Sequence, residues 1–139
     1  MVKRPWLIVL LVVLLDQLTK FLVQAFVRTI PIIPGFLSLD NIHNYGAGFG
    51  ILQGQRMLLI WLSLIVIGFI LYYYDRLGKD RIAAMLILSG ALGNLIDRIF
   101  LIYVVDFIHF SFFPAFNAAD SAVTIGAALL IWNSLRKKS

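Results

Sequence analysis

The sequence predicts an all-α membrane protein with four transmembrane helices and a small extracytoplasmic β element. The prediction rests on three observations: 61% of the 139 residues are hydrophobic, 14% are charged, and the apolar residues gather into long runs. A helix needs about 20 apolar residues to cross the roughly 30 Å hydrocarbon core of a bilayer. Because four such spans would use most of the chain, we expect residues 1–139 to form a single integral membrane domain.

The apolar runs place the helices at about residues 6–26, 57–74, 82–101 and 116–135. A cleaved secretory signal is an alternative for the first run, but its length and the absence of a small-x-small cleavage pattern favour a retained helix. Cytoplasmic flanks of spans are rich in Lys and Arg. We therefore expect both termini in the cytoplasm and segments 27–56 and 102–115 on the opposite side. The cations behind this orientation are Lys3, Arg4, Arg76, Lys79, Arg81, Arg136, Lys137 and Lys138.

The segment after the first span contains too many Pro and Gly residues to be helical. Residues 36–42 alternate imperfectly between apolar and polar side chains, and the Gly-rich stretch 46–50 could reverse the chain into a second strand. We therefore expect a short extracytoplasmic β element here. The chain shows no internal repeat of the kind that marks many transporters.

Polar side chains interrupt the apolar runs at similar depths. Intramembrane charge is costly, and it usually marks function. At 1.5 Å rise per residue, the polar groups of the first and third spans fall in the half remote from the cytoplasm, as do those that open the fourth. We therefore expect one common site. Its members are Asp16 and Lys20 in the first span, Asn94 and Asp97 in the third, Asp106 before the fourth, and Asn117 and Asp120 at its start.

Several of these residues, and also Asn44 and Arg98, have a purely structural interpretation. Asp16 and Lys20 have the i,i+4 spacing of an intrahelical ion pair, which favours helix packing over chemistry. Asp97 and Arg98 are adjacent, so each would find its partner on another element, and a structural role is favoured for both. Asn44 and Asn117 could cap turns or helix ends.

Other chemistries find less support in the sequence. The chain has no Cys, and its two His residues, His43 and His109, are not part of a zinc motif, so no metal is expected. The serines lack a nucleophile motif. Residues 90–93, Gly-Ala-Leu-Gly, favour close helix approach over a phosphate cradle. The net charge of +5 comes from cations at segment ends, so no nucleic-acid partner is expected.

Asp106 and Asp120 suggest an aspartyl protease embedded in the membrane. Peptide hydrolysis needs one ionised carboxylate to take a proton from water and one protonated carboxyl to assist the carbonyl and the leaving amine. Two acids brought close together split their titrations and can share a proton.

Five sequence blocks, in order, resemble the type II, or lipoprotein, signal peptidase family. Two positions depart from the usual family pattern: Ser89 precedes Gly90 where a Gly pair is common, and Gly48 stands where Ala is usual. Both departures keep a small residue and leave the acids unchanged. The blocks are Asp16-Gln17-Leu18-Thr19-Lys20, Asn44-Tyr45-Gly46-Ala47-Gly48-Phe49, Gly90-Ala91-Leu92-Gly93-Asn94-Leu95-Ile96-Asp97-Arg98, Val104-Val105-Asp106-Phe107 and Phe116-Asn117-Ala118-Ala119-Asp120.

The resemblance implies a monomeric endopeptidase of the bacterial cytoplasmic (inner) membrane, with its active site near the extracytoplasmic face. Its substrates would be prolipoproteins, cleaved just before the diacylglyceryl-modified Cys, and its other partners membrane lipids; no cofactor is implied. Asp106 and Asp120 would be catalytic. The substrate-binding or site-supporting residues would be Asp16, Lys20, Asn44, Gly46, Asn94, Asp97, Arg98 and Asn117.

Two non-enzymatic alternatives remain open at this point. A proton-coupled carrier or channel could use the intramembrane Asp residues as a relay. A lipid-binding assembly factor would tolerate loss of both acids and release no peptide.

Overall fold

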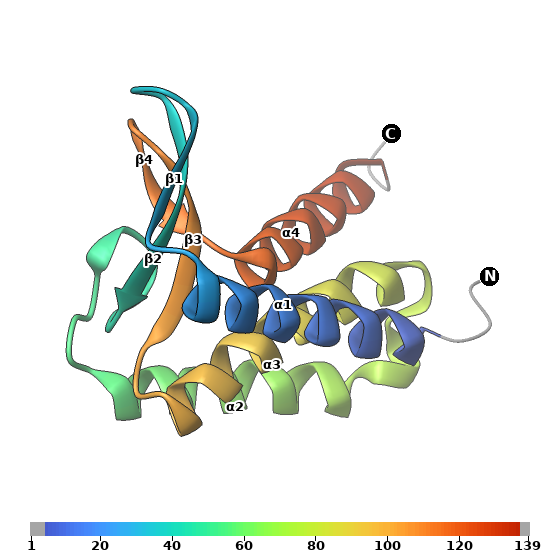
Figure 1. Cartoon of the computed structure of the whole chain (residues 1–139). Coiled ribbons are helices and arrows are strands. Elements are labelled where there is room, and N and C mark those ends of the chain that lie inside the picture. The colour runs from blue at the N-terminus through green and yellow to red at the C-terminus, as the bar shows by residue number, and fades with distance from the viewer. Residues whose placement is uncertain (1–4, 137–139) are drawn as a thin grey trace.

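The computed structural model describes residues 5–136, which form four long helices and one four-stranded sheet (Figure 1). Lys3, Arg4, Lys137 and Lys138, used above to orient the chain, lie outside the described residues. The helices are α1 (Trp6–Phe26), α2 (Arg56–Tyr72), α3 (Arg81–Phe100) and α4 (Ala118–Arg136); the strands are β1 (Thr29–Ile33), β2 (Leu37–Asn44), β3 (Val104–Phe110) and β4 (Phe113–Phe116); and the short 3-10 turns are η1 (Gly48–Gly50), η2 (Tyr74–Arg76) and η3 (Gly78–Asp80).

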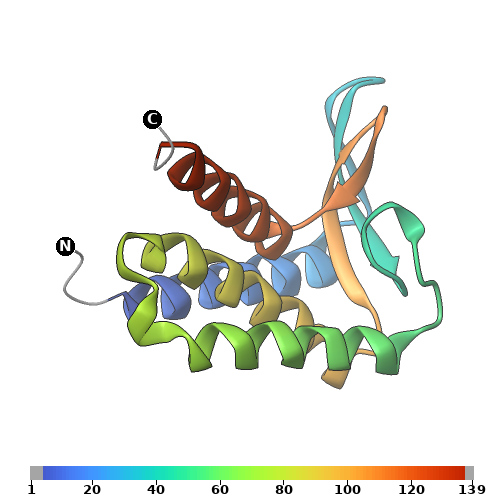
Figure 2. The ribbon, with the colours of Figure 1, turned by 180° about the vertical axis from the view of Figure 1, so that it is seen from behind.

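Helices α1, α2 and α3 run side by side, and the sheet stands at one end of them (Figures 1 and 2). The start of α1 and the end of α4 lie toward the other end. Helix α4 leaves the sheet end beside α1 and α3 and diverges from α1 along its length. This arrangement places the beginning of α4 where the sheet meets the helices.

Within residues 5–136, three helical segments are long and apolar enough to cross a membrane: Trp6–Phe26, Gly78–Phe100 and Ala118–Arg136. Helix α2 is apolar but shorter, with 17 residues. Many large apolar side chains of α1 and α2 are exposed, as expected for surfaces that face lipid rather than water. The structure is therefore a membrane fold with about three spanning helices and a small sheet.

The sheet is larger than the sequence indicated. All its neighbouring strands are antiparallel, in the order β1-β2-β3-β4. The predicted reversal at residues 46–50 is wrong, because β2 pairs instead with β1 before it and β3 far along the chain. The reversal occurs earlier, between β1 and β2, where Gly35 adopts a φ of 74° that suits Gly. The predicted connection at residues 102–115 contains β3 and most of β4.

Small residues let α3 and α4 approach closely, as the Gly-Ala-Leu-Gly sequence predicted. A Cβ atom on Gly90 would collide with the carbonyl oxygen of Ala119 and lie 2.5 Å from a methyl of Val123. On α4, a Cβ atom on Gly126 would lie 2.6 Å from the carbonyl oxygen of Ala83. The prediction of close helix approach is confirmed.

We predict that Gly90→Ala destabilises the protein by about 1–3 kcal/mol, because the added methyl group forces α3 and α4 apart. The measurement is the thermal unfolding midpoint in detergent. Gly68→Ala is the matched control, since a Cβ atom on this helical glycine of α2 meets nothing within 4 Å. Equal unfolding midpoints for the two variants would contradict the close packing of α3 against α4.

Candidate active site

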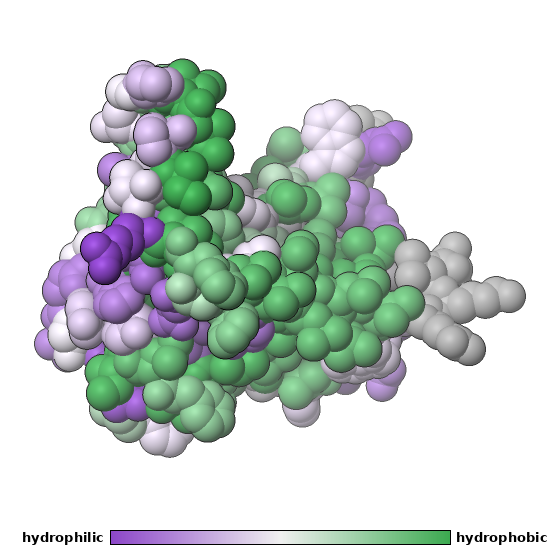
Figure 3. All heavy atoms as spheres, in the orientation of Figure 1, coloured by the Kyte–Doolittle hydropathy of each residue, from purple (hydrophilic) through white to green (hydrophobic). Residues whose placement is uncertain are grey.

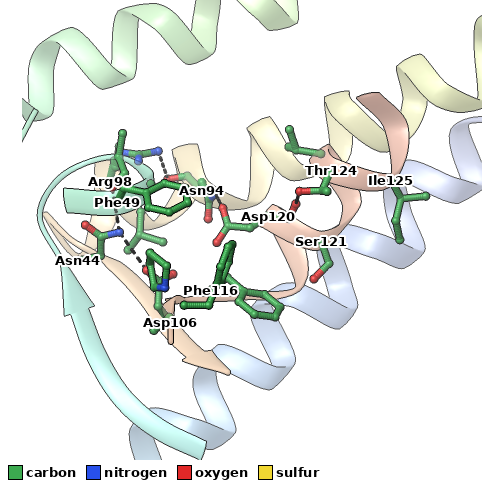
Figure 4. A pocket seen from close by; sticks show the side chains of 17 residues that line it. Asn44, Phe49, Asn94, Arg98, Asp106, Phe116, Asp120, Ser121, Thr124 and Ile125 are labelled. Carbon is green, nitrogen blue, oxygen red and sulfur yellow. Dashed lines mark hydrogen bonds between the residues drawn. The ribbon is translucent and has the colours of Figure 1, made fainter. Parts of the chain in front are cut away.

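Asp106 of β3 and Asp120 of α4 line one cleft at the junction of sheet and helices (Figure 4). The cleft has a volume of about 660 Å³. Asn44, Asn94 and Arg98 also line it, together with the aromatic rings of Phe49, Phe113 and Phe116. The two acids therefore face a cavity large enough for a segment of a substrate.

Two amide side chains hold the carboxyl group of Asp106. Asn44 donates from Nδ2 to Oδ2 at 2.9 Å, and Asn117 donates from Nδ2 to Oδ1 at 2.8 Å. The antiparallel pairing of β2 with β3 sets Asn44 beside this part of β3. Burial, followed by the nearby charge of Asp120, raises the pKa of Asp106 to about 7, although both hydrogen bonds act in the opposite direction.

Asp120 is held by the start of its own helix and by α3. Its Oδ2 accepts a hydrogen bond from the backbone N–H of Asn117 at 3.1 Å, while its own N–H donates to Asn117 Oδ1 at 2.9 Å. This reciprocal pair is a capping box with Asn and Asp in the two positions. Asn94 adds a hydrogen bond from Nδ2 to Asp120 Oδ1 at 2.8 Å.

Asn117 therefore connects the two acids. Its side-chain Oδ1 accepts a hydrogen bond from the N–H of Asp120, and its side-chain Nδ2 donates one to the carboxyl group of Asp106. The side chain is completely buried. The cap that the sequence left as an alternative role for Asn117 is present, and the same residue also contacts both acids.

Behind the cleft lies a buried ion cluster on α1 and α3. The ammonium group of Lys20 lies 2.8 Å from Asp16 Oδ2 and 2.9 Å from Asp97 Oδ2, and it donates to Asn94 Oδ1 at 3.1 Å. All three ammonium hydrogens therefore have an acceptor. The predicted i,i+4 ion pair between Asp16 and Lys20 is confirmed.

The two acids of this cluster hold the elements that carry Asp106 and Asp120. Asp16 Oδ1 accepts a hydrogen bond from the N–H of Ala119 in the first turn of α4 at 2.9 Å. Asp97 Oδ2 accepts one from the N–H of Val105 in β3 at 3.1 Å. The ion cluster thus fixes the backbone directly beside each acid of the cleft.

Arg98 and Gly46 orient Asn44 from the other side. Arg98 donates from Nη2 to the carbonyl oxygen of Gly46 at 3.1 Å, and the N–H of Gly46 donates to Asn44 Oδ1 at 2.9 Å. Only Gly fits this turn, since a Cβ atom on Gly46 would lie 2.6 Å from the carbonyl oxygen of Ile51.

The ten residues singled out in the sequence form one continuous hydrogen-bonded network. Asn94 links the ion cluster to Asp120, and Asn117 links Asp120 to Asp106. From Asp106 the hydrogen bonds continue through Asn44 and Gly46 to Arg98. Arg98 Nη1 in turn donates to the backbone carbonyl oxygen of Asn94, which closes the network.

Two further polar residues support the network but were not singled out in the sequence. Gln17 donates from Nε2 to Asp97 Oδ1 at 2.9 Å and contacts Asp16 and the carbonyl oxygen of Gly93. Arg56 binds the carbonyl oxygens of Arg98 and Ile99 at the end of α3. Gln17 could have been found from the sequence, because it is a polar amide within an apolar span. The sequence gives no comparable sign that Arg56 belongs to the network.

Within residues 5–136, no three His, Asp or Glu side chains are grouped so that they could hold a metal ion. Ser89 donates to the carbonyl oxygen of Met85, one turn earlier in α3, and Ser121 donates in the same way to Asn117. Among the described residues that line the cleft, the carboxyl groups are those of Asp106 and Asp120.

Known proteins are similar to this chain along most of its length. A sequence profile of signal peptidase (SPase) II matches residues 8–136. A lipoprotein signal peptidase of Halothermothrix orenii is 48% identical over 132 residues, covering 91% of this chain and 91% of that protein. A lipoprotein signal peptidase of Streptococcus pyogenes serotype M5 is 41% identical over 141 residues, covering 94% and 93%.

Two solved structures are also similar to this chain. One bacterial membrane enzyme matches with a TM-score of 0.93 and 33% identity, covering 100% of this chain and 92% of that chain. A second matches with a TM-score of 0.85 and 34% identity, covering 97% and 94%. The resemblance seen in the five sequence blocks is confirmed, and the chain belongs to the signal peptidase II family of membrane-bound peptidases.

Proposed function

We propose that this protein is an aspartyl endopeptidase that cleaves the signal peptide of prolipoproteins just before the diacylglyceryl-modified Cys. The observation that carries the proposal is the pair Asp106 and Asp120, which line one cleft and are both bound to Asn117. The names of the relatives, lipoprotein signal peptidase, supply the substrate class.

In the proposed mechanism the pair holds one proton at rest, carried by Asp106. Ionised Asp120 takes a proton from a water molecule as its oxygen attacks the scissile carbonyl carbon. Protonated Asp106 donates a hydrogen bond to the carbonyl oxygen, where negative charge develops. When the C–N bond breaks, a proton passes to the leaving amine, and the products are a carboxylic acid and an amine.

The three asparagines of the site keep the carboxyls oriented during these transfers. Asn44 and Asn117 donate to Asp106, while Asn94 donates to Asp120. Each amide leaves its acid free to exchange protons with substrate and water. Asp16, Lys20 and Asp97 act through the backbone and through Asn94, as positioning residues rather than catalytic ones.

We propose that all four helices span the bacterial inner membrane as one monomeric domain that uses no cofactor. At 1.5 Å per residue, the 17 residues of α2 reach about 26 Å, which suffices where the bilayer thins slightly. Arg76, Lys79, Arg81 and Arg136 lie at the end of the helices remote from the sheet, whereas Arg28 and Arg56 flank the segment between α1 and α2 at the sheet end. The end remote from the sheet would be cytoplasmic and the sheet extracytoplasmic.

The cleft fits a lipid-modified substrate. Its wall includes Val123 and Ile125 of α4, so it joins the apolar surface of a spanning helix. Acyl chains could remain in the bilayer while the peptide bond reaches the two acids. The carrier alternative lacks support from the relatives, and the buried acids cluster near the sheet instead of following a path through the helices.

We predict that Asp106→Asn or Asp120→Asn lowers the cleavage rate by at least about 10²–10⁴-fold, because each removes a proton-transfer group at little steric cost. The measurement is mass spectrometry of a diacylglyceryl-modified prolipoprotein incubated with purified protein. Asp75→Asn, at an exposed position in the turn after α2, is the control and should retain full activity. Substantial turnover by either dyad variant would refute the catalytic assignment.

We predict that the cleavage rate falls as pH rises through about 7, because the raised pKa of Asp106 means that the dyad loses its shared proton there. The stability of the folded protein also falls as pH rises through this range. The folded protein binds the Asp106 proton more tightly than the unfolded chain does, so this stabilisation is complete below about pH 4 and is lost by about pH 7. A rate that keeps rising well above pH 7 would contradict the shared proton.

We predict that Lys20→Met destabilises the protein by about 3–5 kcal/mol, since it leaves Asp16 and Asp97 as buried charges without a cation. Thermal unfolding in detergent measures the effect. Lys79→Met is the control, because Lys79 is exposed and binds only a backbone carbonyl among the contacts described, that of Asn133. An unchanged unfolding midpoint for Lys20→Met would show that the ion cluster does not support the fold.

A further inference from the structure

Gly48, in the short turn η1, lies in the wall of the cleft that holds the two acids. All ten glycines of the chain fall within residues 5–136, and most of them have a clear reason to lack a side chain. Neither reason applies to Gly48 or Gly68. A left-handed φ explains Gly35, Gly50, Gly54 and Gly78, and neighbouring atoms closer than 3.0 Å to an added Cβ explain Gly46, Gly90, Gly93 and Gly126.

The fold does not require a glycine at position 48. A Cβ atom on Gly48 would meet nothing within 4 Å, and the φ of this residue lies outside the left-handed region. Gly loses more conformational freedom on folding than any other residue, so such a glycine costs stability and returns no packing. Gly68 is exposed on α2, away from the site, whereas Gly48 borders the cleft. The open space in front of Gly48 therefore belongs to the cleft.

This space lies close to one of the two acids. The side chain of Asn44 joins them, because its Nδ2 donates to Asp106 Oδ2 at 2.9 Å and contacts the carbonyl oxygen of Ala47 at 3.5 Å. Ala47 is the residue directly before Gly48 and also lines the cleft. A peptide bond held at Asp106 would therefore have its nearest neighbouring residues beside Gly48.

The walls around this space are aromatic. The ring of Phe49 packs edge to face against the ring of Phe113 in β4, with centroids 5.5 Å apart, and both residues line the cleft. A peptide backbone placed against these rings would lose hydrogen bonds to water without replacing them. An apolar side chain would instead gain from burial. The space beside Gly48 thus suits a side chain of the substrate better than its backbone.

The side of the cleft indicates which part of the substrate would lie here. Phe49 and Ile125 lie on opposite sides of Asp120 (Figure 4). Hydrophobic atoms cover the helices, whereas hydrophilic atoms gather where the sheet meets them (Figure 3). Acyl chains on the residue after the cleaved bond would therefore follow the helix wall at Ile125. The residues before the cleaved bond would then lie on the side of Phe49 and Gly48.

We propose that the space in front of Gly48 receives an apolar side chain from one of the two residues before the cleaved bond. Gly48 then sets the largest side chain that this enzyme accepts there. The inference rests on the proposed function and adds a determinant of specificity to it. Because Ala is usual at this position of the family pattern, this chain would accept a larger side chain than a relative that carries Ala.

The test compares three diacylglyceryl-modified prolipoproteins. One has Ala at both positions before the modified Cys, and the other two have Val at one of these positions each. Values of kcat/KM are measured for wild type, Gly48→Ala and Gly48→Val. Gly68→Ala is the matched control, since Gly68 also lacks close neighbours and a left-handed φ but lies outside the cleft.

We expect wild type to cleave at least one Val substrate. For that substrate Gly48→Ala should lower kcat/KM about 10–200-fold more than for the Ala substrate, the usual effect of one methyl group in a filled apolar pocket. Gly48→Val should widen the difference, and Gly68→Ala should leave it unchanged. The thermal unfolding midpoint of Gly48→Ala should not fall below that of wild type, because its Cβ meets nothing in the fold.

Three results would overturn the inference: wild type that cleaves the Ala substrate alone, Gly48 variants with unchanged selectivity, or an equal loss of rate for all three substrates. An equal loss would mean that Gly48 serves the movement of its turn rather than the size of the space. If Gly48→Val fails to fold, Gly48→Ala decides alone. Failure of folded wild type to cleave even the Ala substrate would instead refute the proposed function, and the inference with it.

Discussion

The structure depends on one buried cation. Lys20 lies 2.8 Å and 2.9 Å from two carboxylates that are themselves almost completely buried. An isolated charge in such surroundings would cost several kcal/mol, and the cluster persists because every ammonium hydrogen has an acceptor. The two carboxylates also accept hydrogen bonds from the backbone of β3 and α4. The ion pairs with Lys20 therefore fix the positions of the two elements that carry Asp106 and Asp120.

That constraint separates two roles for acidic residues in one small protein. Asp16 and Asp97 each form an ion pair with Lys20 and serve as fixed anchors. Asp106 and Asp120 are instead held by neutral amides and face the cleft, so each can gain or lose a proton. The raised pKa of Asp106 is the electrostatic counterpart of this difference, because burial and the charge of Asp120 outweigh the amide hydrogen bonds. In the proposed mechanism, chemistry and support thus come from the same residue type in different surroundings.

Much of this organisation could be predicted from the sequence, and the failures have physical reasons. The apolar runs indicated the helices, because lipid demands continuous hydrophobic surface. Asp16, Asp97 and Asp120 were visible as costly charges in those runs. The sheet was harder to predict, since the pairing of β2 with β3 joins residues 60 to 73 positions apart and leaves little local signal. Strand β3 is mostly apolar, so the alternation of polar and apolar side chains that marks a strand was hidden. Arg56 looked like an ordinary basic residue at a helix end, and its contact with α3 could not be predicted.

The central claim is that Asp106 and Asp120 share one proton at neutral pH. The most direct measurement is the infrared spectrum of the protein in bilayers at pH 6.5, in the carboxylic-acid C=O region, for wild type and Asp106→Asn. The account predicts a band from a protonated, buried carboxyl in wild type that disappears in Asp106→Asn and on raising the pH above that of the Asp106 titration. A wild-type spectrum without this band, or a band unaffected by Asp106→Asn, would contradict it.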